Sequence, residues 1–290
     1  MSTSFWEHRP SRPSQRYAER RAAPELDAHV ACVWLLEVAD GGPVYEHRTV
    51  PNGCVEIVSL LGTGVVRVAG PKHSPTLERV EQGQAVVGVR FRPGAAPRVL
   101  KAAAGELVAL DVDLDALWGA EARALSESLS EAATSERAMD VLEQAVAARM
   151  STAPPPDHVV AEAVQRLQPW CRADVMDVAS ALFMSPRQLR RRFVAAVGYG
   201  PKTLQRILRF QGFLALSDAC RGANAPPPVA RLAATAGYAD QAHLTRDCRE
   251  LTGLTPRAFL DERRRSCGSS HDHEASFAFL RRALLAAGRS

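Results

Sequence analysis

The spacing of apolar residues divides the chain into two parts. Up to residue 92, short runs rich in Val, Ile and Leu alternate with turns that contain Gly, Pro and Asn. These runs predict strands over residues 30–38, 44–50, 55–61, 65–69 and 85–92. After Pro93 the apolar positions recur every three or four residues, which is the period of an amphipathic helix. The predicted fold class is therefore α+β, with an antiparallel β-barrel and flanking helices before an all-α domain.

Capping residues and prolines mark the limits of the helices and domains. Asp113 or Asp115 can cap a helix that runs to Leu129, and Ser135 can cap another. Consecutive prolines in Ser151–Asp157 cannot continue a helix and predict a stiff linker. The predicted divisions are a polar N-terminal arm, a β-barrel domain with helices, the linker, a helical domain and a C-terminal tail, over residues 1–23, 24–150, 151–157, 158–262 and 263–290.

A sequence pattern in the helical domain occurs twice. The second copy follows the first at an offset of about 55 residues. The two sets are Leu189, Phe193, Gly198 and Pro201, and Leu244, Cys248, Gly253 and Pro256. A short apolar stripe and a turn precede each copy, and Ser185 and Asp240 can cap the helix that follows the turn. Each copy therefore predicts a helix, a tight turn and a second helix. Residues 202–216 predict a helix that connects the two units, with Arg206 and Arg209 facing solvent.

Polar side chains on the second helix of each unit are typical of DNA recognition. The major groove admits a helix, and Arg and Gln match the edges of guanine and adenine. The alternative is an ordinary helical bundle with solvated arginines, which has no reason to repeat turn, cap and arginines together. The predicted DNA-facing residues are Arg187, Arg190 and Arg191 in the first unit and Gln241, Ala242, Thr245, Arg246 and Arg249 in the second.

These motifs resemble the C-terminal DNA-binding domain of the AraC/XylS family of bacterial transcription regulators. The resemblance is carried by residues 185–193, 237–244 and 253–259. The resemblance implies that seven of the DNA-facing residues occupy base-reading positions, namely Arg187, Arg190, Arg191, Gln241, Ala242, Thr245 and Arg246. Two residues depart from the family pattern. Phe183 stands where the first turn commonly has Gly, which predicts strain at a positive φ, and Cys248 replaces a Phe in the second core.

The N-terminal region also resembles a known family. Residues 51–56, Pro-Asn-Gly-Cys-Val-Glu, and residues 87–94 are similar to an uncharacterised N-terminal domain of some AraC-type regulators. Regulators of this family often carry a cupin-like barrel before the DNA-binding domain, and the helices after the barrel commonly form a dimer. The resemblance therefore agrees with the barrel predicted from strand spacing and implies a sensory or dimerisation domain.

One strand face in this region carries candidate ligand-binding residues. Arg90 and Arg92 share a face of the strand over residues 85–92, and Cys54 and Glu56 share a face of the adjoining strand. If the arginine face lines the barrel, it can bind an anionic effector through bidentate contacts. The alternative is a solvated outer face. Cys54 adds the further alternative of thiol sensing.

Charge is distributed unevenly between the two halves. Residues 1–150 contain 16 basic and 20 acidic side chains, a net charge of −4, whereas residues 151–290 contain 20 and 12, a net charge of +8. This asymmetry indicates that one domain meets a polyanion such as double-stranded DNA. The first residues lack the apolar core of a signal peptide, and no apolar run approaches a membrane span. The sequence thus predicts a cytoplasmic protein without membrane contact.

Histidines and cysteines give no indication of an enzyme. A metal-dependent cupin needs converging histidines, whereas His29, His47 and His73 are isolated in the sequence. Neither a catalytic residue nor a cofactor is therefore predicted. The cysteines form no C-x-x-C pair and are expected to be free thiols.

Two alternative functions depend on these residue types. A cysteine-dependent DNA-binding protein could respond to redox state or accept a methyl group through Cys32 or Cys54, although clustered zinc-binding cysteines are missing. A metal-responsive protein could use Cys267, His271 and His273, although the Gly-Ser-Ser context favours a flexible tail.

The whole sequence predicts a sequence-specific bacterial transcription regulator. The expected partner is double-stranded promoter DNA, with RNA polymerase as a candidate second partner and a homodimer as the expected assembly. A signal or small-molecule effector, whose identity the sequence does not give, is expected to act on the N-terminal domain. We expect that signal to change domain orientation and thus promoter occupancy.

Overall fold

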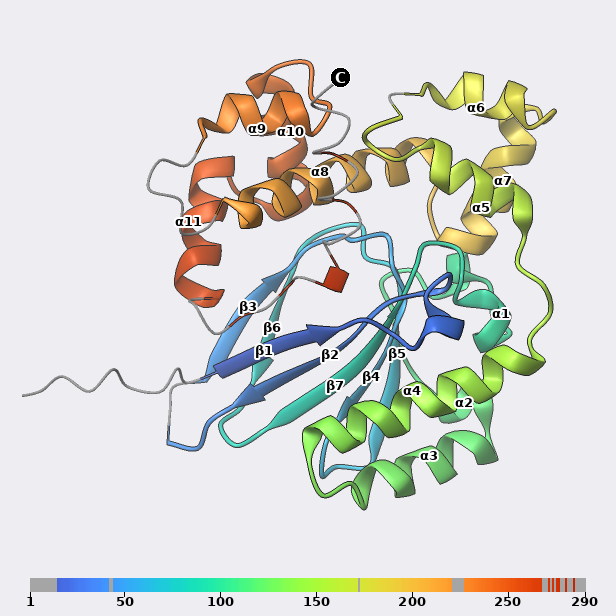
Figure 1. Ribbon diagram of the computed structural model, residues 1–290, viewed down its shortest axis with the longest axis vertical. Coiled ribbons are helices and arrows are strands. Elements are labelled where there is room, and N and C mark those ends of the chain that lie inside the picture. Colours follow the sequence, from blue (N-terminus) through green and yellow to red (C-terminus); the bar gives the residue numbers. More distant parts are fainter. Residues whose placement is uncertain are drawn as a thin grey trace, which may run out of the picture.

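The computed structural model of the chain describes residues 15–41, 44–171, 173–220 and 227–267, with positions 271, 273, 275, 276, 280 and 284 near the C-terminus. Antiparallel strands with helices packed against them form the lower part of Figure 1, and helices alone form the upper part. The predicted α+β class is confirmed.

The strands form two antiparallel sheets. The larger has the order β1-β2-β7-β4-β5-β8, and β3 pairs with β6 in a separate two-stranded sheet. Their bounds are β1 (Gln15–Arg20), β2 (Val30–Val38), β3 (Tyr45–Thr49), β4 (Glu56–Leu60), β5 (Val65–Ala69), β6 (Thr76–Val80), β7 (Ala85–Phe91) and β8 (Asp111–Asp113). The predicted barrel thus takes the form of two sheets around a cavity, and the pairings among the described residues do not close them into a ring.

Three strands were not predicted. Strand β1 lies within residues 1–23, which were expected to form a polar arm, and it pairs along its full length with β2. Its sequence, Gln-Arg-Tyr-Ala-Glu-Arg, contains no apolar run, so only its partners indicate a strand. Arg16 and Arg20 make ion pairs with acids of helix α4 (Ser135–Thr152). Strands β6 and β8 are likewise short and polar.

The larger sheet separates two apolar layers. On one face, Val33, Val87 and Val89 are fully buried in a core that also contains Leu142 and Val146 of α4. On the other face, alternate residues of β2 pack with β3 and β6 in a second cluster. Because successive side chains of a strand point to opposite faces, Arg90 lies on the face of β7 opposite the buried Val87 and Val89, as predicted.

The helices beside the sheet differ in detail from the prediction. Their bounds are η1 (Pro24–Leu26), α1 (Pro97–Leu100), η2 (Ala104–Glu106), α2 (Asp115–Trp118) and α3 (Ala120–Ser130), followed by α4. The single helix predicted to Leu129 is divided at Gly119, whose φ of 59° ends α2. Neither predicted aspartate caps it. The cap of α4 is Thr134 and not Ser135, since the Thr134 hydroxyl accepts a hydrogen bond from the Arg137 amide.

The C-terminal domain is built around one long helix. Its bounds are α5 (His158–Arg166), α6 (Val175–Ala181), α7 (Pro186–Val197), α8 (Pro201–Ala219), α9 (Val229–Thr235), α10 (Gln241–Thr252) and α11 (Pro256–Cys267). Helices α5 to α7 lie at one end of α8, and α9 to α11 lie at the other (Figure 1). Phe193, Phe210, Phe213 and Phe259 are at most 1 % exposed in this core. A shared central helix therefore fixes the two helix pairs relative to each other.

The two domains are in direct contact. The Tyr199 hydroxyl donates a hydrogen bond of 2.8 Å to the carbonyl of Lys72. The buried Gln211 side chain of α8 donates a hydrogen bond of 2.8 Å to the carbonyl of Pro51. Element η2 packs against α7. A change in the N-terminal domain can therefore reach both α7 and α8 through atoms in contact.

Candidate nucleic-acid interface and ligand cavity

The two helix pairs turn with the same backbone conformation. Phe183 has a φ of 55°, and its amide donates to the carbonyl of Ser180 at 3.0 Å. Gly237 has a φ of 89°, and its amide donates to the carbonyl of Ala234 at 3.1 Å. The left-handed region is unfavourable for a residue with a Cβ atom. The strain predicted at Phe183 is therefore present, in a turn that is otherwise equivalent to the second.

Relief of this strain should stabilise the protein. Phe183 is 98 % exposed and has almost no packing to lose. We expect Phe183→Gly to raise the free energy of unfolding by about 0.5–1 kcal/mol, because the strain relieved exceeds the entropy that Gly adds to the unfolded chain. Gly237→Ala should lower it by a similar amount. Urea unfolding checks both, with Phe183→Ala as the matched control that keeps the strain. Equal stability of the Gly and Ala variants at position 183 would contradict this account.

Caps begin and end both recognition helices, α7 and α10. The Ser185 hydroxyl and the Asp240 carboxylate each accept a hydrogen bond from the amide three residues later, at 3.3 Å and 2.6 Å. Gly198 and Gly253 end the helices with φ values of 88° and 76°. The caps and stops predicted from the repeat are confirmed, so local sequence fixes the bounds of both helices.

Cys248 occupies in α10 the buried position that Phe193 occupies in α7. Both side chains are 0 % exposed. The Cys248 sulfur lies 3.6 Å from Thr252 Oγ1, and burial raises the pKa of the thiol to about 11. The smaller core residue predicted here is present, and its thiol is protonated and shielded at neutral pH.

Exposed arginines on α7 and α10 have no partner among the residues that the structure describes. They are Arg187, Arg190, Arg191, Arg246 and Arg249. None of these guanidinium groups makes an ion pair or hydrogen bond with the residues that the structure describes. Their neighbour Arg192 differs, because it pairs with Asp157 at 3.1 Å. An unpaired guanidinium keeps its donors available for phosphate and base atoms.

The other predicted DNA-facing residues differ in exposure. Gln241 and Ala242 are exposed at the start of α10. Thr245 is half-buried, and its hydroxyl donates a hydrogen bond of 2.8 Å to the carbonyl of Gln241. The hydroxyl proton of Thr245 is therefore already used within α10.

Arginines of α8 position α10. Arg206 and Arg209 were expected to face solvent, but Arg206 pairs with Glu250. Arg209 Nη1 lies 3.1 Å from His243 Nε2, and its guanidinium lies 5.4 Å from the centre of the Tyr238 ring. The helical period gave the side of α8 on which these arginines lie, but not the helix that covers that side. Both residues hold the second recognition helix on the connector.

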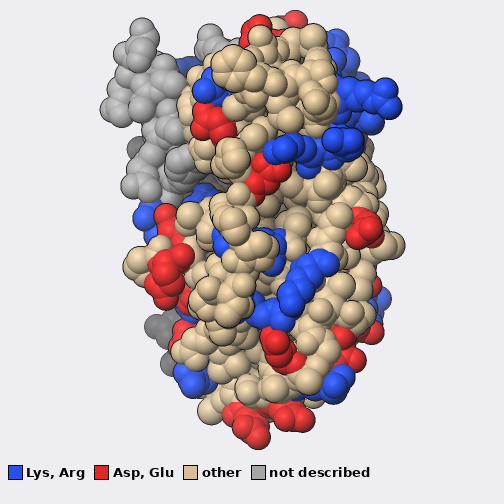
Figure 2. Space-filling view, turned by 90° about the vertical axis from the view of Figure 1, so that its right-hand side faces the viewer, with Lys and Arg blue, Asp and Glu red and all other residues tan. Residues whose placement is uncertain are grey.

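Basic side chains gather on one side of the C-terminal domain. Figure 2 shows the right-hand side of Figure 1, and Lys and Arg lie together along the upper right of this face. The position agrees with the net charge of +8 for residues 151–290. A localised positive field attracts nucleic acid before any base is read.

A cavity of about 970 Å³ lies between the two sheets and extends to the C-terminal domain. Apolar residues of both sheets form much of its wall, including Trp34, Leu36, Tyr45, Val58 and Val86. The helices α5, α8 and α11 contribute Val164, Leu208 and Phe259. Arg90, Arg92, Cys54 and Glu56, the predicted ligand-binding residues, all line it. A cavity of this volume, with apolar walls and charged side chains among its lining residues, has the size and composition of a small-molecule site.

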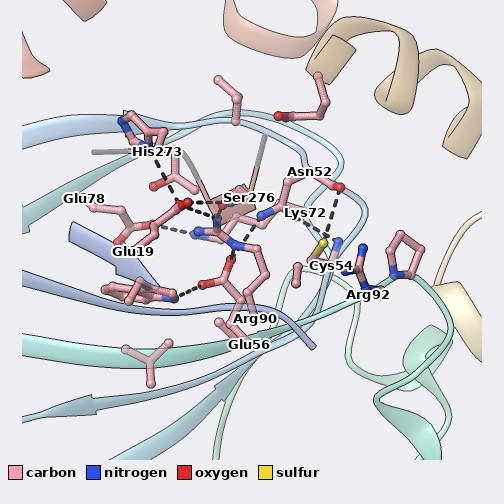
Figure 3. Close-up of a pocket in the computed structure, with 18 of the residues that line it drawn as sticks. Glu19, Asn52, Cys54, Glu56, Lys72, Glu78, Arg90, Arg92, His273 and Ser276 are labelled. Atoms are coloured by element: carbon pink, nitrogen blue, oxygen red, sulfur yellow. Dashed lines mark hydrogen bonds and ion pairs between the residues drawn. The ribbon is translucent and has the colours of Figure 1, made fainter. Parts of the chain in front are cut away.

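A buried ion cluster forms the polar end of this cavity (Figure 3). Arg90 Nε donates to Glu56 Oε1 at 2.8 Å, and Arg90 Nη1 donates to Glu19 Oε1 at 3.2 Å. Burial alone would raise the pKa of Glu19, but the hydrogen bond from His273 and the charge of Arg90 lower it to about 2. Ser276 acts in the same direction. Glu19 is therefore an ionised carboxylate with a side chain that is 0 % exposed.

This lowered pKa predicts an acid-dependent loss of stability. A carboxylate whose pKa is lower in the folded than in the unfolded chain stabilises the fold at pH values above its unfolded pKa. This contribution disappears as the pH falls through the folded pKa. For Glu19 the interval runs from 4.5 to about 2. We expect Glu19→Gln to be less stable at neutral pH and to show a weaker fall in stability over this interval, measured by urea unfolding. Glu37→Gln on β2 is the control. An unchanged pH dependence in Glu19→Gln would contradict the assignment.

The structure does not favour an anion at the predicted arginine face. Arg90 already has two carboxylate partners, Glu19 and Glu56. Arg92 donates to the carbonyl of Asp27 at 2.7 Å and pairs with its carboxylate at 3.4 Å. An anion would therefore have to displace existing partners of both arginines.

The thiols near the cavity are not activated. Burial raises the pKa of Cys54 to about 12 and also raises the pKa of Cys32. The Cys54 thiol donates to the carbonyl of Asn52 at 3.6 Å. Because the thiolate is the reactive form, these environments weigh against the cysteine-dependent alternative.

Residues near the C-terminus lie at the same cavity. His271, His273 and Ser276 are among its lining residues. The two imidazole rings are 6.0 Å apart, and the Cys267 side chain lies outside the described residues. In the part of the chain that the structure describes, no group of three or more metal-ligating side chains is present. The metal-responsive alternative therefore gains no support from the described residues.

The described helices include none with the length and hydropathy of a membrane span.

Among curated proteins, no match to the chain was found. ToxT from Vibrio cholerae O395 is similar in structure at 12 % identity, with a TM-score of 0.39, covering 76 % of this chain and 96 % of ToxT. An apo ToxT variant from Vibrio cholerae strain SCE256 is 11 % identical with a TM-score of 0.45, covering 84 % of this chain and 99 % of that one.

Family comparison gives two matches that coincide with the two parts of the fold. Residues 178–262 match a helix-turn-helix domain, and this range begins in α6 and ends in α11. Residues 18–113 match a domain described as of unknown function, and this range begins within β1 and ends at the last residue of β8. We conclude that residues 178–262 are an AraC-type helix-turn-helix domain and that residues 18–113 belong to that N-terminal domain family.

Proposed function

We propose that the chain is a transcription regulator that binds promoter DNA sequence-specifically through α7 and α10. The observation that supports this most directly is the set of five exposed arginines on equivalent helices of the two units, none of which pairs with a described residue. By contrast, Arg206 and Arg209 of α8 pair with acids of α10. Arg191 and Arg246, which occupy equivalent positions of the two units, have no partner among the described residues and fit a surface whose partners come from another molecule.

The connector sets a separation that fits duplex DNA. Helix α8 has 19 residues. At 1.5 Å per residue such a helix is about 28 Å long. Successive major-groove segments on one face of DNA are about 34 Å apart. With the helix pairs at opposite ends of α8, both recognition helices can enter adjacent segments of the groove (Figure 1).

Regulation by a ligand is the second part of the proposal. The cavity is lined by both domains, so a bound molecule would contact the sheets and helices α5, α8 and α11 together. Filling it would bias how the DNA-binding domain sits on the N-terminal domain, and hence the presentation of α7 and α10.

Because the apolar side of α4 is buried on the sheet, a homodimer would have to use another surface.

Binding to two DNA fragments across a salt series tests the proposal. One fragment is the DNA upstream of the protein's own gene, and the other is the same composition in scrambled order. We expect the natural fragment to bind about a thousandfold more tightly, and binding to both to weaken steeply as salt rises. Equal affinity for the two fragments at every salt concentration would overturn sequence-specific recognition.

A further inference from the structure

Residues near the C-terminus provide partners for the buried carboxylate of β1. The Ser276 amide donates a hydrogen bond of 2.8 Å to Glu19 Oε2, and His273 Nδ1 lies 3.8 Å from Glu19 Oε1. Arg90 Nη1 donates to the Ser276 hydroxyl at 3.0 Å. Figure 3 shows His273 and Ser276 directed toward Glu19 and Arg90 at one end of the cavity. Two nitrogen groups from the far end of the chain therefore complete the surroundings of Glu19.

Aromatic rings surround the same position. The His273 ring lies 4.7 Å from the ring of Tyr17, which in turn lies 6.0 Å from Trp34. The His271 ring lies 5.6 Å from Tyr17 and 5.7 Å from Tyr45. The electron-rich faces of Tyr and Trp attract cations, and a neighbouring carboxylate strengthens that preference. The imidazoles thus lie where an aromatic and acidic wall would hold a cationic group.

The fixed charges of this cluster are unequal. Glu19 and Glu56 supply two carboxylates, whereas Arg90 supplies one guanidinium. Every other Lys and Arg among the described lining residues pairs with an acid other than Glu19 and Glu56. Without the C-terminal residues, Glu19 would keep the Tyr17 hydroxyl and Arg90 as donors but would lose those of His273 and Ser276. Its missing partner would be a positively charged nitrogen that donates hydrogen bonds.

We infer that this cavity binds a cationic nitrogen ligand, an amine or amidine carried on an apolar body, whose nitrogen takes the place of His273 and Ser276 beside Glu19. The apolar body lies against Trp34, Leu36 and Val86 in the cavity. The C-terminal residues hold the same position when the ligand is absent. The inference rests on the proposed ligand-responsive function and names the class of ligand.

Displacement of these residues would reach the DNA-binding domain. Leu280 lines the cavity, and Leu284 is 1 % exposed in the core of the C-terminal domain. A Cβ atom added to Gly212 in α8 would lie 3.0 Å from Leu284 Cδ1. Described residues near the C-terminus therefore lie both at the ligand position, as His273 and Leu280 do, and against α8, as Leu284 does. A ligand that competes with His273 would alter the contacts of α8.

Three probes of similar size and different charge test the inference. They are 2-phenylethylamine, 2-phenylethanol and 3-phenylpropanoate, titrated into the full chain by calorimetry and followed by tryptophan fluorescence. We expect the amine to bind, and the neutral and anionic compounds to bind at least about tenfold more weakly, because only the amine supplies a charged donor to Glu19.

Variants of the protein test the role of Glu19. Glu19→Gln should weaken amine binding about tenfold. Glu37→Gln changes an acid of β2 outside the cavity lining and should leave amine binding unchanged. The double variant His271→Ala/His273→Ala should bind the amine more tightly, since the competitor is removed.

The outcomes separate this inference from the proposed function. Tighter binding of the propanoate than of the amine would overturn the ligand class. Absence of amine binding to both the wild type and the histidine double variant would overturn the inference even if Glu19→Gln fails to fold. DNA binding is measured on the same preparations: its loss would count against the proposed function, whereas normal DNA binding without amine binding would count against this inference alone.

Discussion

Replacement of Arg90 by Met should lower the free energy of unfolding by about 3–5 kcal/mol, because it leaves two carboxylates in the cavity wall without their guanidinium. The side chains of Glu19 and Glu56 are 0 % and 14 % exposed, so water cannot replace the lost partner at Glu19. Met retains most of the length of the Arg side chain, so loss of packing contributes little. Urea unfolding at neutral pH measures the effect.

An exposed ion pair on a strand of the same sheet provides the matched control. Arg67 of β5 pairs with Asp113, and their side chains are 54 % and 70 % exposed. We expect Arg67→Met to cost less than about 1 kcal/mol. Addition of Glu19→Gln to Arg90→Met should recover part of the loss, since one uncompensated charge is removed. If Arg90→Met is no less stable than Arg67→Met, the cluster does not depend on its charge balance.

The strands that the sequence predicted best are those with continuous apolar runs. The predicted bounds of β2 and β5 match the structure. Strand β1 was missed because its residues are polar and its pairing with β2 is not a local property of the sequence. Gly119 divided a predicted helix because a positive φ depends on how the chain must turn, which apolar periodicity does not report.

The DNA-binding domain was more predictable than the cavity. Turns, caps and helix ends depend on residues within a few positions of one another, so Ser185 and Asp240 could be assigned as caps from the sequence. Alternation along β7 placed Arg90 on the correct face, but its partner Glu19 lies in a segment predicted to be an arm. The contacts of Arg209 with α10 are likewise between distant residues. Long-range partners decide what such charged side chains can bind, and no local pattern identifies them.

Arg191→Ala and Arg246→Ala should each weaken binding to the natural upstream fragment by about 1–3 kcal/mol and weaken binding to the scrambled fragment much less. Both side chains are exposed and have no partner among the described residues, so their removal should change folding stability by less than about 0.5 kcal/mol. The helices that carry them lie at opposite ends of α8. Because the two sites share no contacts, the double variant should lose roughly the sum of the two effects.

The ratio of the affinity for the natural fragment to the affinity for the scrambled fragment distinguishes base contacts from phosphate contacts. A base contact is lost only on the natural fragment, whereas a phosphate contact is lost on both and also lowers the salt dependence. Arg123→Ala, on the exposed surface of α3, is the control and should leave both affinities unchanged. Equal losses on the two fragments would assign Arg191 and Arg246 to phosphates, and specificity would then depend on neighbours such as Gln241. No loss on either fragment would exclude these positions of α7 and α10 from the interface, because an exposed arginine that contacts DNA cannot be removed without cost.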